Sequence, residues 1–197
     1  MQPAISPSPF EIRTVAVIGA GTAGRSFALA CVAAGFHVVL EDVMPANLRR
    51  AEADFAEMDL RDSPGSLDLA LTVEDAVRVA DIAVDFVPDE LESKLEIFSM
   101  VDRMAPPKTI LCTPSDALSI TDLASCVYRP ERCFAVRGGF TGVAGLGSAV
   151  RLLYPASADA ATLAATGDFL RSLRMNVQNE PDPDVPVLMK NQTQAAS

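Results

Sequence analysis

The chain has 197 residues, which is enough for one domain of ordinary size with a small appendage. Apolar residues make up 49% and charged residues 21%, a globular composition that argues against disorder. The formal net charge of −10 argues against a nucleic acid or an anionic membrane as a partner held by bulk charge.

The sequence predicts a cytoplasmic, reduced protein. It contains no apolar run of 18 residues, and its first ten residues lack the layout of a signal peptide. The cysteines lack metal-type spacing and lie at positions 31, 112, 126 and 133. Cys31 and Cys112 fall in apolar segments, so we expect buried thiols there.

Short apolar runs alternate with Ala-rich amphipathic stretches along the chain. In chain order we expect a strand over 14–18, a helix over 22–34, a strand over 37–41, a helix over 45–58, a strand over 69–72, a helix over 73–79, a strand over 81–87, a helix over 89–104, a strand over 109–113, a helix over 119–125, strands over 133–137 and 150–154, a helix over 162–173 and a strand over 175–178.

These elements predict an α/β fold of the Rossmann type, a doubly wound, mostly parallel sheet with helices on both faces. We expect an extended lead-in over 1–12, the dinucleotide-binding domain over 13–179 and a Pro-rich flexible tail over 180–197. Ligands of such sheets bind beyond the carboxyl ends of the strands.

The strongest motif is Gly19-Ala20-Gly21-Thr22-Ala23-Gly24, which matches G-x-G-x-x-G between a strand and a helix. Gly19 permits the tight turn, Gly21 lets the backbone approach a pyrophosphate, and Gly24 lets the helix pack closely on the sheet. The helix N-terminus then holds the phosphates. The alternative is a Gly-rich turn without a ligand, but the strand-motif-helix context favours binding.

Asp42 follows the second predicted strand, 18 residues after Gly24. Its carboxylate is placed to accept hydrogen bonds from both ribose hydroxyls of the cofactor, and it would repel a 2′-phosphate. The sequence therefore favours NAD over NADP. The neighbouring Glu41 points to the other face of the strand.

The segment TVAVIGAGTAGRSFALACVAAGFHVVLEDV resembles the start of the NAD-binding domain of 3-hydroxyacyl-CoA dehydrogenases. VADIAVDFVPDELESKLEIFSMVDRMAPPKTIL is similar to that family's fourth strand and following helix, and SDALSITDLASCVYRPERCFAV to its next helix and strand. The resemblance covers about residues 13–178. It implies oxidoreductase chemistry with NAD in fatty acid metabolism.

The resemblance also implies positions for the family's catalytic groups, and there the chain departs from the pattern. The catalytic histidine falls on Arg137, and its partner glutamate falls near residues 149–151, where no acid occurs. The substrate-positioning serine falls on Asp116 and the asparagine on Pro114. Arginine stays protonated and cannot act as the base.

The chain has one histidine, His37, at the start of the second predicted strand. That end of the sheet is opposite the expected cofactor site, and a five-residue strand spans roughly 17 Å. We therefore expect His37 to be a surface residue outside the site. The resemblance further implies that Val87, Pro88 and Asp89 line the cofactor site near the nicotinamide ribose.

Two family segments are reduced in this sequence. Only 29 residues separate Asp42 from Thr72, so we expect the helical hairpin usual there to be cut down, and we expect no helical C-terminal domain in this chain. Both departures argue against acyl-CoA turnover by this chain alone. A helical-domain partner chain or a homo-oligomer would complete the cleft.

Several residues around the predicted cleft have open roles. The glycines at 138, 139, 142, 145 and 147, flanked by Arg137 and Arg151, form either an anion cradle or a plain connection. Asp116 would pair with Arg137, act as a buried general base, or cap the next helix. Tyr154 would donate a hydrogen bond or pack at the core rim.

Two hypotheses follow. In the first, the chain binds NAD(H) without the family's proton-transfer dyad and acts as a cofactor-binding or partner-completed subunit. In the second, it is an active oxidoreductase of an acyl-CoA or a small hydroxy acid, in which Arg137 binds the substrate carboxylate or carbonyl and Asp116 or water takes the proton. Neither hypothesis needs a metal.

Overall fold

The computed structural model describes residues 10–59, 64–138 and 148–183. The strands are β1 (Thr14–Ile18), β2 (His37–Glu41), β3 (Ser66–Ala70), β4 (Ile82–Asp85), β5 (Ile110–Pro114), β6 (Cys133–Arg137), β7 (Ala149–Tyr154) and β8 (Asn176–Pro181). The helices are α1 (Thr22–Ala33), α2 (Pro45–Ala56), α3 (Val73–Val77), α4 (Leu91–Met104), α5 (Ile120–Ala124) and α6 (Ala160–Ser172), with a 3₁₀ turn over Pro130–Arg132.

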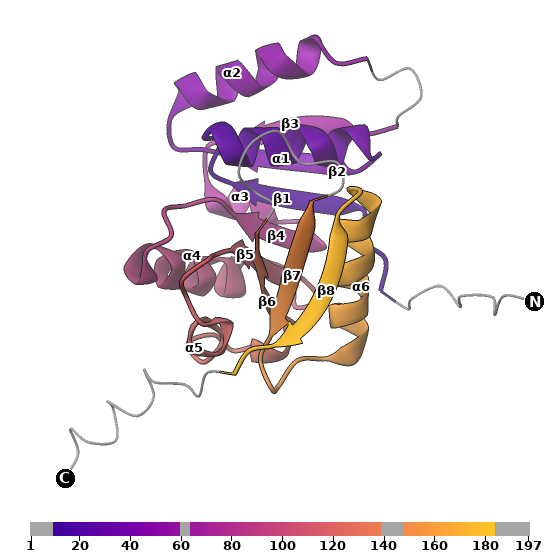
Figure 1. Cartoon of the computed structure of the whole chain (residues 1–197). Coiled ribbons are helices and arrows are strands. Elements are labelled where there is room, and N and C mark those ends of the chain that lie inside the picture. Colours follow the sequence, from indigo (N-terminus) through magenta and orange to yellow (C-terminus); the bar gives the residue numbers. More distant parts are fainter. Residues whose placement is uncertain (1–9, 60–63, 139–147, 184–197) are drawn as a thin grey trace, which may run out of the picture.

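One sheet joins the eight strands of the described residues in the order β3-β2-β1-β4-β5-β6-β7-β8 (Figure 1). Strands β1 to β6 are parallel, β7 runs antiparallel to β6, and β8 is parallel to β7. The chain reverses its direction of travel across the sheet between β1 and β4, which is the switch point where ligands of open α/β sheets bind. The predicted doubly wound fold is confirmed.

The core lies on both faces of this sheet. On one face, side chains of α1, α2 and α6 such as Phe27, Leu48 and Phe169 pack on alternate strand residues. On the other face, Phe98 of α4 and Leu123 of α5 pack with side chains of α3. Because helices cover both faces, the central strands can be apolar throughout.

Most predicted elements are present, with shifted ends. Strand β8 continues through Glu180 and Pro181, which the sequence analysis placed in the tail. The residue after β8 is also bonded to the domain. The Asp182 carboxylate accepts hydrogen bonds from the Ser119 hydroxyl and the Thr121 N–H, both at 2.8 Å. The structured domain therefore extends beyond the predicted boundary at 179. Residues 1–9, 184–197 and the glycines between 139 and 147 lie outside the described residues.

His37 occupies the position that the sequence predicts, at the first residue of β2. Its Nδ1 lies 2.8 Å from the Ser66 hydroxyl, and its Nε2 lies 3.6 Å from an Asp68 oxygen. The ring is 37% exposed, and it lies at the amino-terminal edge of the sheet. His37 is therefore outside any site at the carboxyl edge.

The thiol predictions are also confirmed. Cys31 and Cys112 are buried, and burial raises the pKa of both thiols, that of Cys112 to about 12. Among the described residues, no cluster of His, Cys, Asp and Glu could hold a metal ion. In the same part of the chain, every helix is too short or too polar to span a bilayer.

Candidate cofactor site

The turn that leaves β1 has the conformation that its first glycine allows. Gly19 has φ +97°, a region that residues with a Cβ rarely adopt, and its N–H donates to the Glu41 carbonyl at 2.8 Å. A Cβ at this position would also meet the Phe86 carbonyl at 3.2 Å. Gly19 therefore joins the ends of β1, β2 and β4 at the carboxyl edge.

Gly24 is required by the packing of α1. A Cβ built on Gly24 would lie 1.9 Å from the Gly19 carbonyl oxygen and 3.1 Å from Cβ of Phe86. The helix therefore crosses the turn at a distance that only glycine permits. This role concerns the fold and needs no ligand.

Gly21 differs from the other two glycines of the motif. It is the N-cap of α1 with φ −60° and ψ −179°, a backbone that any residue can adopt. In the part of the chain that the structure describes, a Cβ there would meet no atom within 4 Å, and no side chain caps the helix end. Glycine at this N-cap leaves the first-turn N–H groups open, and a diphosphate can rest on them. The site thus fits a dinucleotide.

Asp42 lies directly after β2 and is 8% exposed. Its Oδ2 accepts from the Ala20 N–H at 2.8 Å and from the Asn47 amide at 3.0 Å, and its Oδ1 accepts from the Met44 N–H at 2.7 Å. A carboxylate has about four acceptor positions, so one remains on Oδ1. Asp42 can therefore accept one ribose hydroxyl while keeping these bonds, rather than the two that the sequence analysis expects.

Glu41 places a second carboxylate beside Asp42. It is the last residue of β2, is 3% exposed, and lies next to Ile18 and Ala70 on the neighbouring strands. Burial raises its pKa to about 6, with a further contribution from the Asp42 charge. Glu41 therefore takes up a proton at higher pH than an exposed glutamate does.

Hydrogen bonds connect the loops that follow β4, β5 and β6. The Asp116 N–H donates to Asp89 Oδ2 at 3.1 Å, and Asp116 Oδ1 accepts from the Gly138 N–H at 3.2 Å. The sequence-predicted residues Asp89, Asp116 and Arg137 are thus brought together along the carboxyl edge, with Pro88 beside Asp89.

The predicted roles of Asp116 need three corrections. Its side chain is exposed, not buried as the predicted general base would be. Within the described residues it forms no ion pair with Arg137, whose Nη2 donates to the Leu118 carbonyl at 2.8 Å instead. It also does not cap α5, because Ser119 does so by accepting from the Asp122 N–H. The helix begins within one residue of its predicted start at 119, and the Ser115 hydroxyl accepts from the Leu118 N–H in the turn before it. Tyr154 packs at the rim of the core, as one of its two predicted roles requires.

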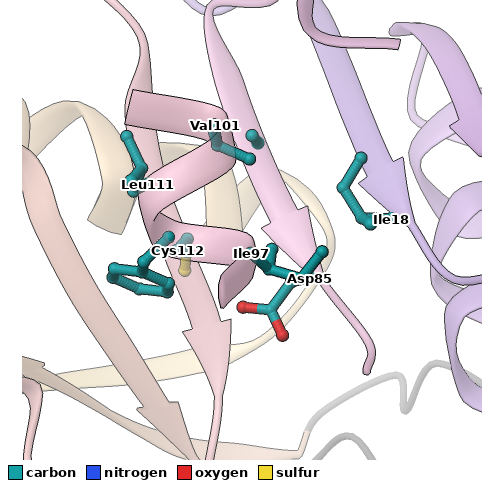
Figure 2. A pocket seen from close by; sticks show the side chains of 8 residues that line it. Ile18, Asp85, Ile97, Val101, Leu111 and Cys112 are labelled. Atoms are coloured by element: carbon teal, nitrogen blue, oxygen red, sulfur yellow. The ribbon is translucent and has the colours of Figure 1, made fainter. Parts of the chain in front are cut away.

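The sequence analysis missed a buried ion pair at the end of β4. Lys94 Nζ lies 2.6 Å from Asp85 Oδ1 and donates to the Pro114 carbonyl at 3.1 Å, and both side chains are 3% exposed or less. Figure 2 shows Asp85 at the end of its strand, between Ile18 and Cys112. The three residues help to line a small pocket of about 10 Å³. Burial raises the pKa of Asp85, and the Lys94 charge opposes that rise.

A sequence signal for this pair exists. Lys94 shares the buried face of α4 with Phe98 and Val101, at the spacing of one helical stripe. A lysine in an apolar stripe needs a buried partner. Asp85, the acid that ends an apolar strand, is that partner.

The strand order, the glycine turn and the carboxylate after β2 together define a dinucleotide-binding domain of the Rossmann type. The family model described as "3-hydroxyacyl-CoA dehydrogenase, NAD binding domain" matches residues 14–177. The chain belongs to this family, whose cofactor is NAD.

The chain is similar to the probable 3-hydroxybutyryl-CoA dehydrogenase of Bacillus subtilis, with 32% identity over 135 residues, 62% of this chain and 47% of that protein. It is 31% identical over 134 residues to the 3-hydroxyadipyl-CoA dehydrogenase of Escherichia coli, 62% of this chain and 28% of that protein. The crystal structure of a 3-hydroxyacyl-CoA dehydrogenase from Archaeoglobus fulgidus matches with a TM-score of 0.73 and 27% identity, over 94% of this chain and 61% of that one. The chain thus spans less than half the length of these two curated relatives.

Proposed function

We propose that this chain binds NAD(H) at the carboxyl edge of its sheet and does not perform the family's proton transfer with its own residues. The cofactor-binding residues in this proposal are the turn Gly19–Gly24, Asp42 and the loop Val87–Asp89. The observation that carries it is Gly21, which leaves open space over the uncapped N–H groups at the start of α1, where a diphosphate would rest.

Each group of the site has a separate task in this proposal. The first-turn N–H groups of α1 hold the diphosphate, and the positive end of the helix favours its charge. The free acceptor position on Asp42 Oδ1 holds a ribose hydroxyl. When bound, NAD supplies the group that accepts or donates a hydride.

The missing base supports the second half of the proposal. The chain has one histidine, and it lies at the amino-terminal edge of the sheet. Arg137 ends β6, where the family resemblance locates the catalytic histidine, and its guanidinium stays protonated at neutral pH. A hydroxyl proton therefore has no histidine acceptor in this chain.

A fluorescence titration with NADH tests the cofactor half. The wild-type chain should bind NADH, and Gly21→Val should weaken binding at least about 100-fold, since a side chain would occupy the space left for the diphosphate. Circular dichroism and a thermal melt establish that the variant is folded. The matched control is Ser26→Val, later on the same helix. Equal NADH affinity of Gly21→Val and wild type would contradict the proposal.

NADH oxidation with acetoacetyl-CoA tests the catalytic half. The names of the curated relatives point to CoA thioesters as the substrate class to try first. The NADH-loaded chain should show no turnover above the rate without enzyme. Turnover that survives repurification would overturn this half and leave the binding half intact.

The second candidate is an active oxidoreductase with Asp116 as the base, acting on an acyl-CoA or a small hydroxy acid. One observation favours it, because hydrogen bonds link Asp116 to both the predicted cofactor loop and the end of β6. Under this candidate, Asp116→Asn abolishes turnover and leaves NADH affinity unchanged. Under the first candidate, a helical partner chain or a second copy would supply the base, and adding it would be required for activity.

A further inference from the structure

Two arginines lie opposite each other at the carboxyl edge of β6 and β7. Arg137 and Arg151 are partners in the antiparallel register, so their side chains project from the same face of the sheet. Like charges in directly opposed positions destabilise a strand pair. This arrangement is expected where an anion is held between the two guanidinium groups.

An open pocket of about 440 Å³ lies over this pair. Its described lining consists of Asp116, Arg137, Gly138, Ala149, Val150, Arg151, Asn176 and Gln178. The volume is within the usual range for small-molecule sites. Gln178 is opposite Arg151 and Asn176 is opposite Ala149 in the parallel register, so the two amides border the arginine pair.

The two arginines of this pocket differ in their partners. Among the described residues, Arg137 has no carboxylate partner, and its Nε has no hydrogen-bond partner at all. Arg151 lies 3.4 Å from Glu180, but both side chains are more than one third exposed, and such a pair contributes little. The Asp116 carboxylate accepts from a backbone N–H. The formal charges of these two arginines and two carboxylates therefore sum to zero, and the Arg137 guanidinium is the group that no described carboxylate pairs.

We propose that this pocket binds the carboxylate of a small, singly charged organic acid between Arg137 and Arg151. Guanidinium groups match the two oxygens of a carboxylate, and the Asn176 and Gln178 amides can bond a hydroxyl or carbonyl elsewhere on the same molecule. Asp116 in the lining and Glu180 beside Arg151 would repel the second charge of a phosphate dianion. The inference goes beyond NAD binding and does not depend on it.

The pocket is contiguous with the proposed cofactor site. Asp116 lines the pocket and donates its N–H to Asp89, which belongs to the loop after β4. An acid held at this position would lie on the side of β6, two strands from β4 in the sheet. The pocket therefore defines the substrate or effector class of the chain as a carboxylic acid.

Isothermal titration calorimetry on the full chain without NADH tests the proposal, with 3-hydroxybutyrate, uncharged 1,3-butanediol and inorganic phosphate as probes. We expect 3-hydroxybutyrate to bind at least about tenfold more tightly than either of the others. Arg137→Gln and Arg151→Gln should each weaken its binding at least about tenfold. Arg151 is half-exposed, so its variant keeps the test valid if Arg137→Gln does not fold.

The matched control is Arg78→Gln, which removes the same charge from an exposed arginine of the α3 end paired with Asp75. It should bind 3-hydroxybutyrate as wild type does. The proposal is overturned if the folded chain shows no heat with 3-hydroxybutyrate, if phosphate binds as tightly, or if Arg151→Gln binds like wild type. Because NADH is absent, a failure of the cofactor assay and a failure of this assay are distinct results.

Discussion

Glu41 combines deep burial with a neighbouring negative charge, and its titration should be visible in the stability of the fold. Its pKa is raised to about 6, so the unfolded chain loses this proton at lower pH than the folded chain does. Ionisation of Glu41 therefore destabilises the fold as pH rises from about 4.5 to above 6. The effect is about 2 kcal/mol at most.

The variant Glu41→Gln removes this titration. Its free energy of unfolding relative to wild type should rise across that pH window and level off above pH 7. Urea unfolding at half-unit pH steps measures the difference. A difference that is constant from pH 4.5 to 7.5 would show that Glu41 keeps an ordinary pKa in the folded chain.

The ion pair of Asp85 and Lys94 is the second residue-scale case. Replacing Lys94 with Met leaves the Asp85 carboxylate buried without a counter-charge, and we expect a loss of about 3–5 kcal/mol. Without Lys94 the pKa of Asp85 rises further, so the loss grows as pH rises through that pKa. Chemical denaturation at pH 5 and pH 8 measures both the loss and its direction.

The double variant Asp85→Leu with Lys94→Met serves as the control for this pair. The side chains around Asp85 are apolar and include Ile18, Ile97 and Cys112. The double variant should therefore recover most of the stability that Lys94→Met loses. A double variant as unstable as Lys94→Met alone would mean that packing, rather than the unpaired charge, dominates the loss.

At the scale of elements, the turn between β1 and α1 divides its glycines between folding and binding. Gly24→Ala places a Cβ on the Gly19 carbonyl and must displace α1, at a cost of about 3 kcal/mol. Gly21→Ala meets open space and should cost less than about 1 kcal/mol. Thermal melts without cofactor separate the two variants. Equal destabilisation of both would contradict this division.

The elements also show where sequence patterns are sufficient. Strands β1, β2 and β6 are apolar, buried on both faces and predicted to the residue, because periodicity and burial agree there. The first half of strand β8 lies within the strand predicted over 175–178, whereas its end, 179–181, gives no apolar signal and belongs to the strand through its pairing with β7. Edge strand β3 begins earlier than predicted, directly after Gly65, where a Cβ would lie 1.9 Å from the Val32 carbonyl oxygen.

Like the strands, the candidate cofactor site was predictable from the sequence only where local patterns define it. The glycine motif and Asp42 follow rules of local sequence, so their positions agree with expectation. Other features of the site depend on which strands are neighbours and in which register. These are the number of donors on Asp42, the hydrogen bonds from Asp89 through Asp116 to Gly138, and the pairing of Arg137 with Arg151. Spacing along the chain does not encode that register.

At the scale of the whole molecule, the net charge of −10 acts on every anionic ligand. NADH is itself an anion, so long-range repulsion opposes its approach, and salt screens that repulsion. The first-turn N–H groups act only at contact distance and are screened less. We therefore expect NADH affinity to rise by about two- to fivefold between 10 and 150 mM salt.

The arginine pocket should respond to salt in the opposite way. Its attraction for a carboxylate comes from exposed guanidinium charge, which salt screens and chloride competes for, so 3-hydroxybutyrate affinity should fall over the same range. Titrating both ligands in the same buffers makes each the control for the other. If both affinities fell in parallel, local charge would govern the two sites alike, and the global field would have no measurable part in cofactor binding.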